Sequence, residues 1–459
     1  MSDQATGSTG TGSADGGGSG KVSRRSFLRG VGGAGLGGLV IGGVGGYVAG
    51  NGSSSSDSAS SGGASGGGST APITIGVGSP VTGPFAGDGQ QMVRGAQLAV
   101  EELNAMGGVA GRQLEVQVLD TKAQEPDVMK SVLQKFVSQN VAAMLIGFTT
   151  YTSVEYPIAG ESKIPMFHVN TWQDNVEYVA KNQITNIYQG DPSQLSYGPG
   201  LIVLINDLID QKKWTPSAQT IAIVSSNDPY SLSISKSFEA GMNDQGWETT
   251  LFEQFTVPQA DYSAILVKIR ANPPGIVFFS DYAPGDEASF IKQFRQSPTK
   301  SLVYEQYAPS IPEYLDLAGP AADGVLWSTV VGVIQGDPIA ERFNVAFKEK
   351  FGREAGFSNA GDHYDMTKMW ATAASLAGDP YDFESVNAIL ASSAYRGVCG
   401  AYTFTNAGPG ELTCIPYPDE TADPSIGMAH LTFQIQNGKQ VLIAPDPYTT
   451  GSFQLPEWL

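Results

Sequence analysis

The sequence predicts an α/β protein with two doubly wound lobes. Buried strands alternate with amphipathic helices along the chain, which is the pattern of parallel sheets covered by helices. The alternation breaks at Asp191-Pro192 and then begins again, so we expect a second sheet after that point. The chain from residue 71 onward is also too long for one hydrophobic core and suits two domains of ordinary size.

The spacing of apolar residues sets the elements of the first lobe. Strands are expected where short apolar or alternating runs occur, and helices where apolar residues recur every three or four positions. Gly107-Gly108 ends the first helix, because glycine tolerates the left-handed conformation that closes a helix. In chain order we predict a strand over 73–78, a helix over 91–106, a strand over 113–119, a helix over 127–138, and strands over 142–146 and 165–169.

The second lobe follows the same rules. In chain order we predict a helix over 196–211, a strand over 220–225, a helix over 231–244, a strand over 249–255, a helix over 262–271, a strand over 275–279, a helix over 287–296 and a strand over 301–305. Ligands of such sheets bind beyond the carboxyl ends of the strands. We therefore expect those ends to face each other and a small molecule to bind in the cleft between the lobes.

The first 50 residues have the pattern of an export signal. Arg24-Arg25 precede an uncharged stretch over 30–50, which is typical of a twin-arginine signal peptide. About half of that stretch is glycine, which weakens a helix, so cleavage near Ala49 and retention as a membrane tether both stay open. Residues 51–70 are rich in Ser and Gly and predict a disordered, flexible linker. We expect a periplasmic or cell-surface protein.

Composition excludes several classes of function. The formal net charge is −19, whereas nucleic-acid binding requires a basic face. The histidines and cysteines are dispersed and show no metal-binding spacing, and the body has no paired nucleophile and base and no phosphate loop. We therefore expect no cofactor, no nucleic-acid partner and no enzyme activity. Cys399 and Cys414 would form a disulfide outside the cytoplasm, with two free thiols as the alternative.

Several segments from Ile73 to Asp446 resemble one family in their order along the chain. They are Ser79–Gly89, Arg94–Gly111, Asp228-Pro229-Tyr230, Asp261-Tyr262-Ser263, Ala318–Gly324 and the start of a helix at His363-Tyr364-Asp365. The chain resembles the type I periplasmic solute-binding proteins of branched-chain amino acid and amide–urea ABC transporters. The resemblance implies a monomer that closes over a small ligand and delivers it to ABC transporter permease subunits.

The resemblance also implies a hinge of three crossings between two Rossmann-like lobes. They are expected near 188–191, 325–328 and 431–434. Lobe 1 would then hold residues 71–190 and 326–430, and lobe 2 would hold residues 191–325 and 431–459. Hinge closure around a ligand is a known motion of two-domain binding proteins.

Two loops of lobe 1 are expected to bind a carboxylate. Thr152 and Glu155 fit a capping box, which would direct the free N–H groups of a helix start into the cleft. The resemblance places ligand contacts on this loop and on the next one. The predicted binding residues are Thr152, Ser153, Asn170 and Thr171, and Trp172 would be either a wall of the site or part of the core.

In lobe 2 the resemblance identifies two tyrosines that close over the ligand. They are Tyr230 and Tyr282, and each offers an apolar ring and a polar hydroxyl. In the first loop of lobe 1, Phe85 would line the apolar end of the cleft.

The acid that would pair with a ligand ammonium is ambiguous. Glu305 lies in the expected region, but counting back from Gly319 puts Tyr307 at the acidic position, and Asp281 is a further acid. A buried charge must be paired, so an acid in the cleft predicts an amino acid. Tyr307 there predicts a ligand without an ammonium, such as an amide or another carboxylate.

The leading hypothesis is therefore a transport receptor for an amino acid, branched-chain or other. The alternative is a receptor for an amide, urea or a small carboxylate, in transport or in sensing. Sensors that resemble this fold work inside the cell, so the export signal favours transport.

Overall fold

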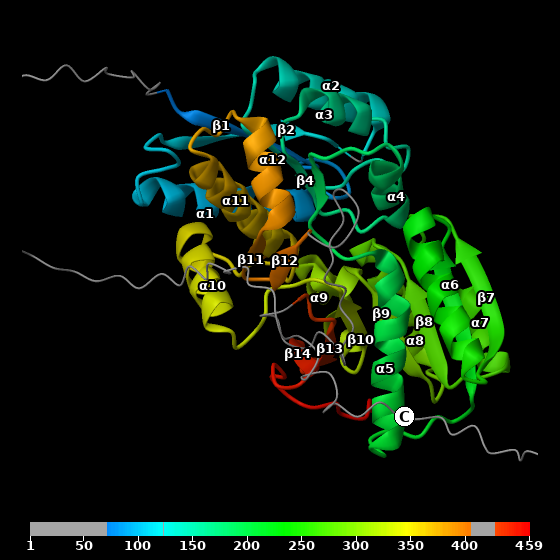
Figure 1. Ribbon diagram of the computed structural model, residues 1–459. Helices are drawn as coiled ribbons and strands as arrows, with labels where there is room; N and C mark the ends of the chain where they lie inside the picture. Colours follow the sequence, from blue (N-terminus) through cyan, green and yellow to red (C-terminus); the bar gives the residue numbers. More distant parts are fainter. Residues whose placement is uncertain (1–70, 123, 405–426) are drawn as a thin grey trace, which may run out of the picture. The chain divides into compact units, whose positions relative to one another are not determined.

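The computed structural model of the protein describes residues 71–122, 124–404 and 427–459 (Figure 1). All of them belong to one compact unit. The predicted signal segment, the Ser/Gly linker and Cys414 lie outside the described residues. Within the described ranges, none of the helices is both long and apolar enough to span a membrane.

The first sheet confirms the predicted α/β class. It has five strands in the order β2-β1-β3-β4-β5, and all neighbours are parallel. Parallel neighbours require crossover helices, which the chain supplies between successive strands. The strands are β1 (Ile73–Ser79), β2 (Leu114–Asp120), β3 (Ala143–Ile146), β4 (Met166–His168) and β5 (Ile187–Gln189), and the helices are α1 (Ala86–Ala105), α2 (Pro126–Ser138), α3 (Tyr156–Ser162) and α4 (Gln173–Lys181).

Three helices from the later part of the chain complete this lobe. They are α10 (Pro338–Phe351), α11 (Asn359–Ala377) and α12 (Phe383–Ser392). Helix α11 lies directly against α1, as Figure 1 shows. The contact is close because α1 carries a glycine there: a Cβ atom on Gly95 would stand 2.0 Å from the carbonyl oxygen of Ala360.

Gly95→Val should therefore destabilise the protein. The new side chain would push apart two packed helices, and overpacking of this kind costs about 1–3 kcal/mol or more. Urea unfolding followed by circular dichroism measures the change. Gly285→Ala in α8 is the matched control, since nothing lies within 4 Å of its Cβ position. Equal midpoints for the two variants would contradict the packing assignment.

The second sheet has seven strands in the order β14-β13-β10-β9-β8-β6-β7. Its strands are parallel except β13, which runs antiparallel to β10 and β14. Its strands are β6 (Thr220–Ser226), β7 (Glu248–Phe255), β8 (Ile276–Ser280), β9 (Leu302–Gln306), β10 (Leu326–Thr329), β13 (Leu431–Gln436) and β14 (Lys439–Ala444), and its helices are α5 (Tyr197–Asp210), α6 (Pro229–Asp244), α7 (Ser263–Ala271), α8 (Pro284–Gln296) and α9 (Pro312–Ala318).

Strand pairing places one lobe boundary at a different residue from the predicted one. Strand β10 pairs with β9 and β13, so residues 326–329 belong to the seven-stranded sheet. The chain therefore leaves lobe 2 after Thr329, and not at 325–328 as the sequence suggested. The reason is that the Leu-Trp-Ser-Thr run of β10 finds its hydrogen-bonding partners within the second sheet.

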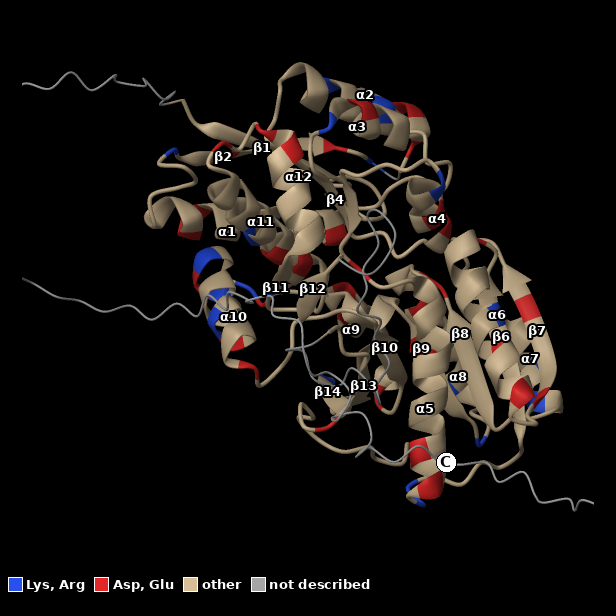
Figure 2. Ribbon diagram, in the orientation of Figure 1, with Lys and Arg blue, Asp and Glu red and all other residues tan. Residues whose placement is uncertain are grey.

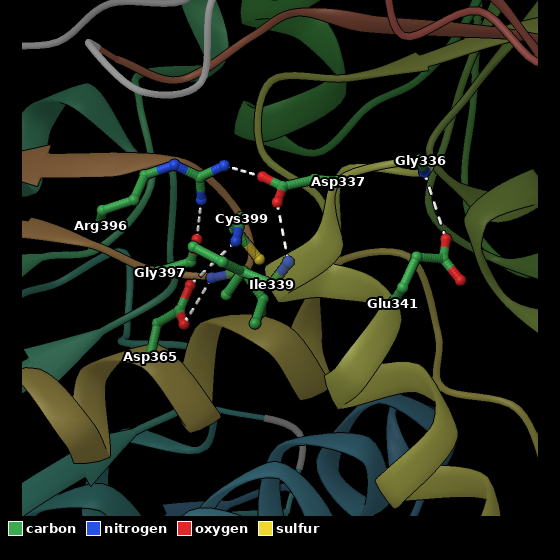
Figure 3. A network of polar contacts seen from close by, with 9 residues as sticks. Gly336, Asp337, Ile339, Glu341, Asp365, Arg396, Gly397 and Cys399 are labelled. Atoms are coloured by element: carbon green, nitrogen blue, oxygen red, sulfur yellow. Dashed lines mark hydrogen bonds and ion pairs between the residues drawn. The ribbon is translucent and has the colours of Figure 1, made fainter. Parts of the chain in front are cut away.

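A small hairpin packs on α11. It consists of β11 (Ala394–Arg396) and β12 (Ala401–Thr403), and Figure 3 shows how it is held. Asp365 of α11 accepts hydrogen bonds from the backbone N–H groups of Val398, at 2.8 Å, and Cys399, at 3.0 Å. Arg396 forms an ion pair with Asp337. Cys399 is a buried free cysteine here and Cys414 lies outside the described residues, so the disulfide stays a prediction.

Candidate functional site

The loops at the carboxyl ends of the two sheets touch each other. Phe85, which follows β1, lies against Tyr282, which follows β8, with ring centroids 5.4 Å apart. The hydroxyl of Tyr307, after β9, donates a hydrogen bond to Asp88 of α1 at 3.2 Å. The first contact brings together Phe85 and Tyr282, which were predicted to lie on opposite sides of one cleft. A solute held there would contact both lobes.

The loop after β3 differs from its prediction. Helix α3 begins at Tyr156, and no capping box forms between Thr152 and Glu155. The carboxylate of Glu155 instead accepts the backbone N–H of Thr150, at 2.6 Å, and its hydroxyl, at 2.7 Å. The loop therefore folds around an internal carboxylate, and Thr152 is exposed with its hydroxyl 3.1 Å from that of Thr150.

A buried threonine connects the two predicted carboxylate loops. The hydroxyl oxygen of Thr149 accepts hydrogen bonds from the side-chain amides of Asn175, at 2.6 Å, and Asn170, at 3.0 Å. Ser153 donates its hydroxyl to Asn175 over 2.9 Å. The predicted residues Ser153 and Asn170 thus lie in one hydrogen-bond network. Its other members, Thr149 and Asn175, were not predicted from the sequence. No local motif could reveal them, because these partners are 21 and 26 residues apart.

Trp172 has an indole N–H without a hydrogen-bond partner among the described residues. It stands at the start of α4, half-buried, with its ring 5.2 Å from that of Tyr151. Its Nε1 is buried. A buried donor without a partner is costly, so an acceptor from a solute would stabilise this position. The neighbouring Thr171 is buried and accepts a backbone hydrogen bond from Gln194 at 2.9 Å.

The lobe 2 tyrosines form a connected aromatic wall. The hydroxyl of Tyr230 accepts a hydrogen bond from Gln306 at 3.3 Å, and its ring lies 6.2 Å from that of Tyr307. Burial raises the pKa of Tyr282 to about 12, so its hydroxyl stays protonated at neutral pH. Protonated hydroxyls beside ring faces can hold a solute that is partly apolar and partly polar.

Glu305 and Tyr307 occupy different surroundings. Glu305 is fully buried beneath α9, where it accepts the hydroxyl of Tyr314, and burial raises its pKa well above the usual range. Tyr307 faces lobe 1 and donates its hydroxyl to Asp88 at 3.2 Å. Its φ of 77° and ψ of −58° belong to a rare, strained turn conformation. Tyr307 therefore makes a lobe-to-lobe contact that Glu305 does not make.

Other acids lie near the cleft, and they are not arranged around a metal. Asp281, which follows β8, is fully buried, and its burial raises its pKa to about 7. Across the described ranges, no group of three or more His, Cys, Asp or Glu side chains is placed to hold a metal ion. The predicted binding residues and Asp281 thus offer ring faces, hydroxyls, amides and buried carboxyls.

A family model and a curated relative both match this chain over most of its length. A family model described as "Periplasmic binding protein" matches residues 72–412. The Leu/Ile/Val-binding protein homolog 2 of Brucella abortus (strain 2308) is 27% identical over 354 residues, which cover 76% of this chain and 90% of the relative.

Two solved structures extend the comparison. A putative branched-chain amino acid ABC transporter protein from Silicibacter pomeroyi is 32% identical with a TM-score of 0.78, covering 85% of this chain and all of that one. A solute-binding protein of an ABC transporter from Rhodopseudomonas palustris BisB5, in complex with 3,4-dihydroxybenzoic acid, is 18% identical with a TM-score of 0.66, covering 83% and 98%. The second likeness shows a shared fold.

Proposed function

The chain belongs to the periplasmic binding protein family, and we propose that it is the extracytoplasmic solute receptor of an ABC transporter. It captures one small organic solute between its two lobes and alters none of the solute's bonds. The observation that carries this proposal is the meeting of the loops after β1 and β8 through Phe85 and Tyr282. Permease subunits are its partners, and a twin-arginine signal delivers it across the membrane.

The first ligand class is an amino acid with an apolar side chain. The relatives named for leucine, isoleucine and valine support this class. In lobe 1, the N–H of Trp172 and the loop of Thr171 offer donors to a carboxylate. The rings of Phe85, Tyr230 and Tyr282 would surround the apolar side chain.

The second ligand class is a carboxylate that lacks an ammonium, and a specific contact favours it. Glu305 is bonded to Tyr314, whereas Tyr307 is the residue that reaches the other lobe. A tyrosine hydroxyl does not neutralise an ammonium as a carboxylate does. The dihydroxybenzoate-bound protein shows that this fold can hold an aromatic carboxylate.

A thermal-shift panel tests the function and separates the two classes. Leucine, 4-methylpentanoate and leucinamide share a carbon skeleton and differ only in the ammonium and carboxylate groups. Ligand at about 100 times its Kd stabilises a protein by about 2.7 kcal/mol, which such a scan detects. A shift by leucine supports the first class, and a shift by 4-methylpentanoate alone supports the second. If valine, isoleucine, benzoates, urea and amides also gave no shift, or if a bound solute were turned over, the proposal would fail.

Tyr282→Ala should weaken binding of the solute that the panel identifies by about tenfold or more. The substitution removes a ring that closes the cleft from lobe 2, and buried aromatic contacts are commonly worth over 1.4 kcal/mol, which is tenfold in Kd. Tyr282→Phe keeps the ring and is the matched control. Titration calorimetry gives both constants. An unchanged Kd in the alanine variant would remove Tyr282 from the site.

A further inference from the structure

A cavity lies on the seam between the lobes. It has a volume of about 280 Å³, and its walls come from α1, the loop before α11 and the start of α9. The first two belong to lobe 1, and α9 belongs to lobe 2. We call this cavity the seam pocket and define it by Asp88, Arg94, Glu313, Arg353 and Asn359.

One wall of the seam pocket carries two arginines that lack an acidic partner. Among the described residues, none of the ion pairs involves Arg94 or Arg353. Within the described ranges, the guanidinium of Arg94 donates a hydrogen bond only to the amide oxygen of Gln90, at 3.1 Å. Burial and the charge of Arg353 lower the pKa of Arg94. Two guanidinium groups that repel each other attract an anion. Figure 2 shows further basic residues on α10, the helix that leads to Arg353.

Two acidic residues, Asp88 and Glu313, line another part of the seam pocket. Glu313 of lobe 2 lies against Gly87, because a Cβ on that glycine would stand 3.6 Å from the glutamate carboxylate oxygens. The charge of Glu313 adds to burial in raising the pKa of Asp88 to about 7. Glu313 forms no ion pair within the described ranges. The other acid of the pocket wall, Glu354, is already paired with Lys348.

We propose that the seam pocket is a second binding site, for a small zwitterion of the amino acid class. Its anionic group would lie between Arg94 and Arg353, and its cationic group would lie between Asp88 and Glu313. This arrangement pairs each like-charged couple with the opposite charge, which relieves both repulsions at once. The site is separate from the cleft and does not depend on which solute the cleft takes.

Occupation of the seam pocket should favour contact between the lobes. Asp88 accepts hydrogen bonds both from Tyr307 of lobe 2 and from Asn359 of lobe 1, the latter at 2.7 Å. A zwitterion that bridges the arginines and Glu313 adds a further link between the same elements. A molecule that binds the closed form better than the open form shifts the population toward closure.

Binding of 4-aminobutyrate to the full-length protein, measured by titration calorimetry, tests the proposal. Butyrate and butylamine are the matched probes that carry one charge each. We expect 4-aminobutyrate to bind the wild type and still to bind the cleft variant Tyr282→Ala. Each single-charge probe should bind at least about tenfold more weakly, since hydrogen bonds to charged groups are among the strong ones.

Substitutions in the pocket complete the test. Arg94→Gln and Glu313→Gln should each weaken 4-aminobutyrate binding by about tenfold or more. Lys130→Gln on α2, whose side chain is 44% exposed, should leave it unchanged. Arg353→Gln, at an exposed position, serves if Arg94→Gln does not fold. No binding of 4-aminobutyrate, equal binding of butyrate, or loss of binding only in Tyr282→Ala would overturn the proposal. The identity of the cleft solute found by the thermal-shift panel does not depend on any of these results, so the two proposals fail separately.

Discussion

Thr149→Val will both destabilise lobe 1 and weaken solute binding. The substitution keeps the shape of the side chain and removes the oxygen that accepts hydrogen bonds from Asn170 and Asn175. Both asparagines are buried, and each polar group left without a partner costs about 1–3 kcal/mol. Urea unfolding should show that loss. The Kd should rise as well, because the same network positions the two loops that face the cleft.

Thr372→Val is the matched control for this substitution. Thr372 is an exposed residue of α11, and its hydroxyl bonds only to a carbonyl of the preceding turn. Exposed substitutions of this kind change stability by within about 0.5 kcal/mol. If Thr149→Val unfolded at the same urea concentration as Thr372→Val and bound the solute as the wild type does, the network would have no role in the site.

Asp362→Asn will stabilise the protein at neutral and alkaline pH. Asp362 of α11 is buried near Asp191, which lies on the first crossing between the lobes, and near Asp365. Burial raises the pKa of Asp362 well above its usual range, and burial followed by the charge of Asp362 does the same for Asp191. The groups that face this cluster from other elements are Cys399, Tyr402 and, beside Asp191, Tyr197. The positive charge of Lys368 on α11 lowers the pKa of Asp365, which opposes the effect of burial.

The stability of the wild type should fall as the pH rises, because burial raises the pKa of Asp362. The folded protein holds the proton of Asp362 more tightly than the unfolded chain, whose aspartates have a pKa of about 3.9. At acidic pH the carboxyl is protonated in both states and does not destabilise the fold. Stability is lost as the pH rises from about 4 toward the raised pKa of the folded state. Asparagine carries no charge, so the variant should lose less stability over that range. The gain at pH 8 should exceed about 1.4 kcal/mol, the free energy of one pH unit between the two pKa values.

Thermal unfolding from pH 4 to pH 8 measures this effect. The wild type should fall in Tm relative to Asp362→Asn as the pH rises, and the two curves should converge at pH 4. Asp316→Asn, at an exposed position of α9, should follow the wild type throughout. Parallel curves for Asp362→Asn and the wild type would mean that the buried carboxyl is not held protonated by the fold.

The apolar pattern was enough to predict strands β1 to β4 and β6 to β9 and helices α1, α2 and α5 to α8. The predicted strand over 73–78 and helix over 127–138 agree with β1 and α2 to within one residue. These elements bury one face or both, so their periodicity is strong. Strands β13 and β14 were not predicted, because they add to the second sheet from a segment far along the chain. Strand β10 was assigned to the wrong lobe for the same reason.

The candidate site was predictable in outline and not in detail. The loops after the strands were found because strand ends are visible in sequence. Side-chain directions were not, since they depend on register: Glu305 shares its face of β9 with Val303, and both are buried there. The predicted capping box does not form, because the carboxylate of Glu155 accepts a hydrogen bond from Thr150 instead. Competition of that kind depends on distances that no spacing rule contains.

A crystal structure with the solute found by the thermal-shift panel shows directly whether both lobes hold one solute. We expect one molecule between the loops after β3 and β4 on one side and Tyr230 and Tyr282 on the other, with all of its covalent bonds intact. A solute bound entirely to one lobe, or found only in the seam pocket while the cleft stays filled by protein side chains, would contradict this expectation.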